Sequence, residues 1–132
     1  MSSIFSKIIR REIPAYIVAE DDQFLAFLDV FPIREGHVLV VPKLEIDKWH
    51  DLPETALQQM LVFAQPIAKA IEKNFPCKRC GISIIGLEVP HAHLHLVPID
   101  TADDLNFTRP KLNSNPQELT EVHATLCAAL KA

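Results

Sequence analysis

The stretch His91-Ala92-His93-Leu94-His95-Leu96-Val97 carries the most information in this sequence. Successive side chains alternate across a β-strand, so its three histidines would project from one face. Ala92, Leu94 and Leu96 would project from the other face, which has the apolar pattern of a core-facing surface. Three imidazoles spaced about 6.6–7 Å apart along a strand are costly to bury unless their face is exposed to solvent or forms a functional site. The pattern predicts a strand over residues 91–99 with a solvated or functional histidine face.

Three interpretations of the histidine row follow from the residue types. A merely solvated surface strand is disfavoured, because three of the six histidines in the chain cluster in one row. A metal site is a second interpretation, since three imidazoles and one open position suit a catalytic zinc. Nucleophilic catalysis is the third, in which one imidazole takes up a phosphoryl or nucleotidyl group and a neighbour orients it. Composition does not choose between the last two.

Length, charge and composition restrict the class of protein. The 132 residues fit a single domain, residues 1–132, because domains usually take roughly 100–200 residues. Apolar residues make up 48% and charged residues 23%, which excludes a disordered chain. The formal net charge of −4 offers no basic excess, so no nucleic-acid partner is expected.

The location expected from the sequence is the cytoplasm. No apolar run approaches the ~20 residues that span a bilayer, so no membrane association is expected. Nothing near the amino terminus has the pattern of a secretory signal. Three cysteines are an odd count for a disulfide scaffold, which favours a reducing compartment.

Hydrophobic periodicity and proline punctuation predict an α+β domain with about five strands and two substantial helices. The expected strands cover residues 15–19, 24–28, 37–41, 81–87 and 91–99. A long helix is expected from Glu54 to Lys73, with an acidic cap at Asp51. Its expected buried stripe is Leu57, Met60, Leu61, Ala64, Ile67, Ala68 and Ile71. A short helix over residues 4–9 and a carboxy-terminal helix starting at Asn115-Pro116 complete the expectation.

The sequence resembles the histidine triad (HIT) family of nucleotide hydrolases and transferases, in particular its Hint-like branch. Residues 91–97 match the family signature His-φ-His-φ-His-φ-φ, where φ is apolar. Residues 4–14, 20–29 and 36–43 resemble upstream blocks of the same branch in the same order. The resemblance implies a HIT-like fold, with an antiparallel sheet of about five strands, one long helix and a carboxy-terminal helix.

The resemblance also implies roles for individual side chains. His93 matches the nucleophile, His95 the histidine that contacts the phosphate, and His91 the supporting first member of the triad. His37 matches a histidine packed behind the nucleophile, and Asp29 matches the carboxylate that accepts the ribose hydroxyls. The remaining residues matched to the substrate site, in the base pocket and the phosphate loop, are Val30, Phe5, Ile8, Ile13, Gly86, Glu88 and Val89.

One departure from the family pattern lies in the loop before the triad. Family members usually place Asn, Gly and then Ser or Thr there, and the hydroxyl donates to the phosphate. In this chain Glu88 stands about where that hydroxyl is expected. A carboxylate repels a phosphate unless it points away, so the side-chain contribution of this loop is altered.

A second departure concerns metal. Some bacterial relatives hold a structural zinc on two cysteines, a histidine and the first triad histidine. Here Ser3, Ser6 and Glu45 occupy the first three of those positions, so no metal or other cofactor is expected. Cys77 and Cys80 form a separate pair, but two ligands alone do not make a zinc site.

The activity implied by the resemblance is hydrolysis of nucleoside 5′-monophosphate derivatives, in particular phosphoramidates such as AMP-amines, through a covalent nucleotidyl-histidine. The alternatives are a dinucleoside polyphosphate hydrolase, a purine-nucleotide binding module with little turnover, and a His₃ metalloenzyme. A homodimer is expected, because the apolar strand at residues 81–85 would aggregate as an open edge. Val62 and Phe63 lie outside the main helix stripe, and a two-fold partner would cover helix and edge together.

Overall fold

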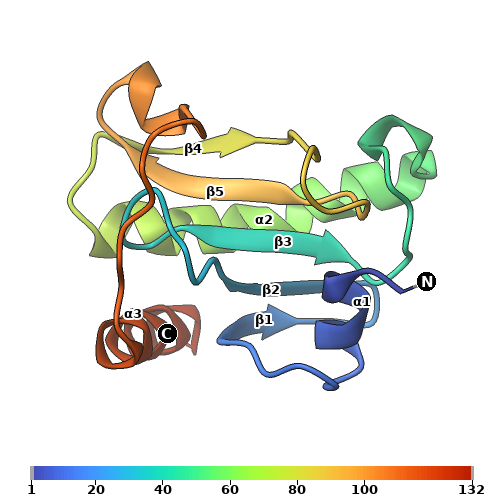
Figure 1. Cartoon of the computed structure of the whole chain (residues 1–132), viewed down its shortest axis with the longest axis horizontal. Helices are drawn as coiled ribbons and strands as arrows, with labels where there is room; N and C mark the ends of the chain where they lie inside the picture. Colours follow the sequence, from blue (N-terminus) through green and yellow to red (C-terminus); the bar gives the residue numbers. More distant parts are fainter. Residues whose placement is uncertain (1, 132) are drawn as a thin grey trace.

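A five-stranded antiparallel sheet separates helix α1 from helices α2 and α3 in the computed structural model, which describes residues 2–131 (Figure 1). The strands are β1 (Ile17–Glu20), β2 (Phe24–Leu28), β3 (Val38–Pro42), β4 (Arg79–Ser83) and β5 (Leu94–Ile99), in the order β1-β2-β3-β5-β4. The helices are α1 (Ile4–Ile9), α2 (Glu54–Asn74) and α3 (Pro116–Lys131), with short 3-10 turns η1 (Trp49–Asp51) and η2 (Ala102–Leu105). The predicted α+β class is confirmed.

Both faces of the sheet are covered, which explains the continuous apolar runs of β2 and β3. One face packs against α2 and α3 and contributes Phe24, Ala26, Leu28, Val38 and Val40 to the larger core. The opposite face packs against α1 and forms a smaller cluster of Phe5, Ile8, Leu25, Phe27, Leu39 and Val41. The histidines lie on the side of this smaller cluster.

Strand β5 is shorter than the predicted strand over residues 91–99. It begins at Leu94, because the N–H groups of His91 and Ala92 donate to Val89 O (2.8 Å) and Ile46 O (2.7 Å) rather than to a sheet neighbour. Within the strand the predicted alternation is confirmed. His95 lies opposite Leu39 of the smaller cluster, whereas Leu94 and Leu96 belong to the larger core.

The predicted strand over residues 81–87 is also corrected. Strand β4 starts earlier and pairs with β5 from Arg79 opposite Ile99 to Ser83 opposite His95. The chain then leaves the sheet, and Gly86 adopts φ 76°, a left-handed conformation that suits glycine. Residues 84–93 therefore form a loop that leads into the histidines. At the other edge, β1 begins two residues later than predicted.

Helix α2 has the predicted extent but differs in two details. Its amino-terminal cap is Pro53, without a side-chain cap hydrogen bond, and Asp51 ends η1 instead of capping the helix. Leu61, predicted in the buried stripe, is exposed. The buried side chains are Met60, Ala64, Ile67, Ala70 and Ile71. Because they keep the spacing of three and four residues, Leu61 falls on the flank of the stripe.

The segment between η2 and α3 crosses the end of the sheet at which β3 begins and β5 ends (Figure 1). The N–H of Leu112 donates to Pro32 O (2.8 Å), which fastens this segment to the loop between β2 and β3. Helix α3 starts as predicted, with Glu118 N–H donating to Asn115 Oδ1 (2.8 Å) and Asn115 N–H donating to Glu118 Oε1 (3.2 Å). Among the described residues, no helix combines the length and apolarity needed to cross a bilayer.

Candidate active site

Four histidines converge where β3 and β5 meet. His37 directly precedes β3, His95 lies in β5, and His91 and His93 lie at the end of the loop before β5. All four are buried, but His93 and His95 keep 6% and 8% of their surface exposed, more than His37 and His91 do. The last two are therefore the members that a substrate can reach.

The hydrogen bond of His93 fixes which ring nitrogen is free. His93 Nδ1 lies 2.7 Å from the backbone oxygen of His91, and a carbonyl oxygen can only accept. The proton of the neutral ring is therefore on Nδ1, and Nε2 carries the lone pair. Burial lowers the pKa of His93, so the ring is neutral at physiological pH. An unprotonated imidazole nitrogen at the surface of the site is a nucleophile.

The His37–His95 pair places a hydrogen-bond donor beside this nucleophile. The N–H of Ile33 donates to His37 Nδ1 (3.2 Å), so His37 carries its proton on Nε2 and donates to His95 Nδ1 (2.9 Å). His95 then carries its own proton on Nε2. Burial lowers the pKa of each of these two histidines to about 3, so both rings are neutral. The ring centroids of His93 and His95 are 5.0 Å apart, which brings an acceptor and a donor together.

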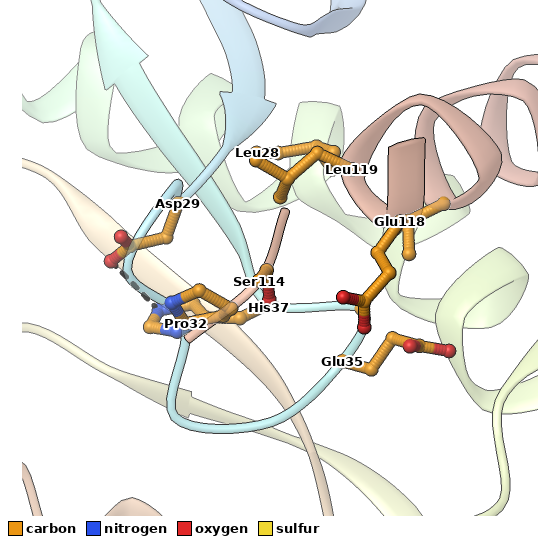
Figure 2. A pocket seen from close by; sticks show the side chains of 10 residues that line it. Leu28, Asp29, Pro32, Glu35, His37, Ser114, Glu118 and Leu119 are labelled. Atoms are coloured by element: carbon orange, nitrogen blue, oxygen red, sulfur yellow. Dashed lines mark ion pairs between the residues drawn. The ribbon is translucent and has the colours of Figure 1, made fainter. Parts of the chain in front are cut away.

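Asp29 approaches His37 from the end of β2. Its Oδ2 atom is 3.7 Å from His37 Nε2, and its Oδ1 atom accepts the N–H of Phe31 (2.9 Å). Burial raises the pKa of Asp29, and the Glu88 carboxylate raises it further. Figure 2 shows Asp29 and His37 facing one another, with Ser114 near His37. A cavity behind Asp29 and His37, towards Leu119 and Val122 of α3, holds only about 10 Å³, so a substrate does not bind on that side of the two residues.

Asp29, His37 and His95 lie close enough to offer three ligands to a metal ion. The N–H of Ile33 nevertheless holds the proton of His37 on Nε2, the nitrogen that faces both partners. The geometry therefore suits a chain of hydrogen bonds. Because His91, His93 and His95 each commit ring nitrogens to different partners, the triad also does not converge as a His₃ metal site.

His91 is held by a cluster of hydroxyl groups from α1. Its Nε2–H donates to Pro42 O (2.7 Å), and its Nδ1 accepts the hydroxyl of Ser3 (2.7 Å). Ser6 N–H donates to Ser3 Oγ (3.0 Å), while the Ser6 hydroxyl and the Ser3 N–H both donate to Glu45 Oε1 (2.5 and 2.7 Å). These bonds lower the pKa of Glu45 to about 2. Two hydroxyls and one carboxylate do not fit the sulfur and nitrogen ligands of a structural zinc.

The aromatic wall on the amino-terminal side is Phe5. Its ring centroid lies 4.9 Å from that of His93 and 5.8 Å from that of His91, both edge-on. Ile8 is buried in the same cluster, and Ile13 and Val89 pack against it. The structure thus gathers the three residues matched to the base pocket and places Val89, from the loop matched to the phosphate, against them.

Three other residues matched to the substrate site lie around it on loops. Val30 is exposed beside Asp29. Gly86 and Glu88 belong to the loop that leads from β4 to the histidines. Burial is the largest influence on the pKa of His93 and lowers it, whereas the charge of Glu88 raises it. Glu88 is therefore close enough to influence the site electrostatically.

Two residues of the site were not predicted from the sequence. The Phe107 ring centroid is 4.5 Å from that of His95 and 6.0 Å from that of His37. Lys111 Nζ donates to Phe107 O (3.0 Å) and lies 5.1 Å from the centre of the Phe107 ring. The available signal was a single aromatic residue in an otherwise polar segment between Leu105 and Leu112.

The fold and the site define a class of α+β proteins with neutral, hydrogen-bonded histidines at the junction of two central strands. The chain belongs to the HIT family, whose HIT domain model matches residues 10–102. The adenosine 5′-monophosphoramidase HNT1 of Saccharomyces cerevisiae is 35% identical over 130 residues, covering 97% of this chain and 82% of that protein.

Solved structures agree with this membership. A HIT-like protein of Bartonella henselae has a TM-score of 0.83 at 30% identity, covering 97% of this chain and 96% of that one. A Zn-bound histidine triad family protein of Mycobacterium smegmatis has a TM-score of 0.81 at 31% identity, covering 99% and 94%. The family, fold and enzyme class predicted from the sequence are confirmed.

Proposed function

We propose that this protein hydrolyses nucleoside 5′-monophosphoramidates, in particular AMP-amines, to the monophosphate and the free amine. The observation that carries the proposal is the hydrogen bond from His93 Nδ1 to His91 O, which leaves Nε2 as a nucleophile at the reachable edge of the site. The likeness to a yeast adenosine 5′-monophosphoramidase supports the substrate class.

The reaction runs in two displacements at phosphorus. His93 Nε2 attacks the α-phosphorus, the phosphorus–nitrogen bond breaks, and the leaving amine takes a proton from water. The positive charge of the substituted imidazole is stabilised by its Nδ1–H bond to His91 O. His95 Nε2–H donates to the phosphate oxygens, which accumulate charge in the transition state. Water then attacks the phosphorus, the bond between phosphorus and His93 Nε2 breaks, and the water's proton passes to solvent. His93 returns as a neutral imidazole.

The ribose and the base of the substrate bind to residues next to the histidines. Asp29 accepts the ribose hydroxyls, since its carboxyl oxygens are acceptors and its side chain is still 21% exposed. The apolar side formed by Phe5, Ile8 and Ile13, with Val30 beside Asp29, contacts a purine base. Gly86 and the N–H groups of Glu88 and Val89 bind the phosphate from the loop before the triad.

The test is turnover of adenosine 5′-phosphoramidate by His93→Ala, with His50→Ala as a control, because His50 is exposed on η1. His93→Ala is expected to lose nearly all activity, and intact-mass analysis of rapidly quenched wild type should reveal a nucleotidyl adduct. Activity of His93→Ala within tenfold of wild type, about 1.4 kcal/mol in barrier, would remove His93 as the nucleophile.

The alternatives give other outcomes in the same assay. Turnover abolished by a chelator would assign a metalloenzyme. Faster cleavage of diadenosine triphosphate than of the phosphoramidate would assign a dinucleoside polyphosphate hydrolase. AMP binding without turnover would assign a purine-nucleotide binding module, in which the Glu88 carboxylate near the site opposes attack on phosphate.

We also propose that the protein is a homodimer through α2 and the edge strand β4. A groove of about 370 Å³ runs between them, and its lining includes Leu61, Val62 and Ile82, which are 55%, 58% and 48% exposed. A two-fold partner would cover this groove and the free edge together. Light scattering should give a mass near twice 14.8 kDa, and Val62→Glu should shift it towards the monomer. A wild-type mass near 14.8 kDa at every concentration would contradict the dimer.

We place the protein in the cytoplasm. Its three cysteines, Cys77, Cys80 and Cys127, are free thiols, and a reducing compartment keeps thiols in that state. Fractionation of cells carrying the tagged full chain checks this placement.

A further inference from the structure

Hydrogen bonds hold the segment 106–112, which runs from η2 towards α3, to η2 and to the loop between β2 and β3. In its middle, Arg109 Nη1 donates to Asp104 Oδ1 in η2 (3.0 Å), and Arg109 N–H donates to Asn106 O (3.2 Å). At its end, Leu112 N–H donates to Pro32 O (2.8 Å), in the loop that also carries Asp29. The position of Lys111 relative to the histidines is therefore set by the fold.

The Phe107 ring contacts both the His95 ring and the Lys111 ammonium. Phe107 packs against His95 at 4.5 Å between centroids, and Lys111 Nζ lies 5.1 Å from the centre of the same ring. The ammonium and the His95 ring, which faces the nucleophile, therefore share Phe107 as a neighbour. Its hydrogen bond goes to a neutral carbonyl oxygen, Phe107 O. Among residues 2–131, Lys111 forms no ion pair with a carboxylate, so its charge is not neutralised by a direct partner.

The charge of Lys111 reaches the centre of the site. Burial is the largest cause of the pKa changes of His37, His95 and Asp29, and the Lys111 ammonium lowers the pKa of all three. The other groups there are neutral imidazoles and the carboxylates of Asp29 and Glu88. A nucleotide phosphate entering this site meets two negative charges, and Lys111 supplies a positive charge beside them.

We propose that Lys111 is a substrate-binding residue that leaves the Phe107 carbonyl and contacts the phosphate of the bound nucleotide. This inference rests on the proposed function, because it takes the ligand to be a nucleoside monophosphate. Lysine suits the role, since its ammonium is a point charge on a flexible stem and is exposed here. In this chain the positive charge of Lys111 offsets the charge of the Glu88 carboxylate, which acts on Asp29 in the opposite direction.

The test compares AMP with adenosine, which differ by the phosphate, in calorimetric titrations of wild type, Lys111→Gln, Lys111→Arg and Lys69→Gln. Lys69 is an exposed lysine of α2, on the opposite side of the sheet from α1, and serves as the control. Lys111→Gln is expected to weaken AMP binding about tenfold and to leave adenosine binding within about twofold. Lys111→Arg should restore most of the AMP affinity, and Lys69→Gln should change neither ligand.

Two results would overturn the inference. Equal losses for AMP and adenosine would mean that Lys111 only supports Phe107, and unchanged AMP binding would mean that it does not contact the phosphate. The proposed function fails separately, if wild type binds AMP without hydrolysing phosphoramidates. In that case, a selective loss of AMP affinity in Lys111→Gln would still support the contact between Lys111 and the phosphate.

Discussion

The two walls of the histidine site come from opposite ends of the chain and are held in different ways. On the amino-terminal side, Phe5 sits on a helix and contacts His93. On the carboxy-terminal side, Phe107 sits in a segment without regular structure beyond η2 and contacts His95. Each of the two most accessible histidines therefore has one phenylalanine neighbour, but only the neighbour of the nucleophile lies in a helix.

The polar groups behind the two walls differ in the same way. The charge on the amino-terminal side, Glu45, is engaged by Ser3 and Ser6, which also hold His91. The charge on the carboxy-terminal side, Lys111, contacts a neutral carbonyl and an aromatic ring. Because Glu45 is hydrogen-bonded to one side-chain and one backbone donor, it holds Ser3 and Ser6 in place. The ammonium of Lys111 lies on a flexible stem and can move to a ligand. We therefore expect the side chains around His93 to keep their positions when a ligand binds, and Lys111 on the His95 side to move.

The largest expected effect is the loss of the helical wall. Phe5→Ala removes a buried ring that contacts Phe27, His91 and His93, and it should lower the free energy of unfolding by about 3–5 kcal/mol. Denaturant titration measures the change. Phe31→Ala, at an exposed phenylalanine, should stay within about 0.5 kcal/mol of wild type. Similar losses in both variants would mean that Phe5 does not fasten the site.

A smaller effect is expected at Asp29, which lies between the two walls. If its carboxylate accepts the ribose hydroxyls, AMP should bind more tightly than 2′,3′-dideoxy-AMP by about 1–3 kcal/mol. Asp29→Asn should reduce that preference, because a neutral amide oxygen is a weaker acceptor than a carboxylate. Calorimetry of both ligands on both proteins makes the measurement. Equal affinity of wild type for the two nucleotides would remove Asp29 from the ribose site.

The amino-terminal wall was largely predictable from the sequence, and the carboxy-terminal wall was not. The alternation around Leu94, His95 and Leu96 follows from strand geometry, and the resemblance to a known family supplied His37, Asp29 and Phe5. The contact of Phe107 with His95 depends instead on the path of a loop. That path is fixed by the hydrogen bond from Leu112 to Pro32, and no periodicity encodes such a pairing.

The ring protons could not be predicted either. They follow from the partners of individual nitrogens, such as Ile33 N–H on His37 Nδ1. The early start assigned to β5 was wrong for a related reason. The alternating pattern of residues 91–97 continues upstream of Leu94, but the backbone of His91 and Ala92 bonds to Val89 and Ile46 outside the sheet.

The third prediction concerns the pH dependence on the carboxy-terminal side. Burial holds the pKa of His95 at about 3, and Phe107 is one of the groups that bury it. Phe107→Ala exposes the ring, so its pKa should rise towards the ordinary value of about 6.5. A larger share of His95 is then protonated at pH 5, and His37 can no longer donate to its Nδ1. The ratio of kcat/KM at pH 8 to that at pH 5 should rise about twofold to tenfold over wild type.

Nuclear magnetic resonance titration of the His95 ring checks the cause directly. Phe31→Ala serves as the control, because it removes an exposed phenylalanine and should leave the titration unchanged. A wild-type His95 that already titrates near pH 6.5 would contradict the buried, neutral dyad.

The smallest effect is expected from the charge on the amino-terminal side, at Glu45. Hydrogen bonds from Ser6 and Ser3 lower its pKa from 4.5 to about 2, so the folded state favours the ionised carboxylate. The stabilisation is therefore complete above pH 4.5 and is lost as the pH falls towards 2. Glu45→Gln should lower the urea midpoint at pH 7, and the difference from wild type should shrink through this acidic range.

Ser6→Ala provides the matched control for Glu45, because it removes the hydroxyl donor and leaves the carboxylate. If the two side chains act as a pair, Ser6→Ala should destabilise wild type more than it destabilises Glu45→Gln. A gap between wild type and Glu45→Gln that stays constant from pH 7 to pH 2 would mean that the carboxylate does not fasten α1. The rigidity of the His93 side would then rest on the Ser3–His91 bond and the packing of Phe5.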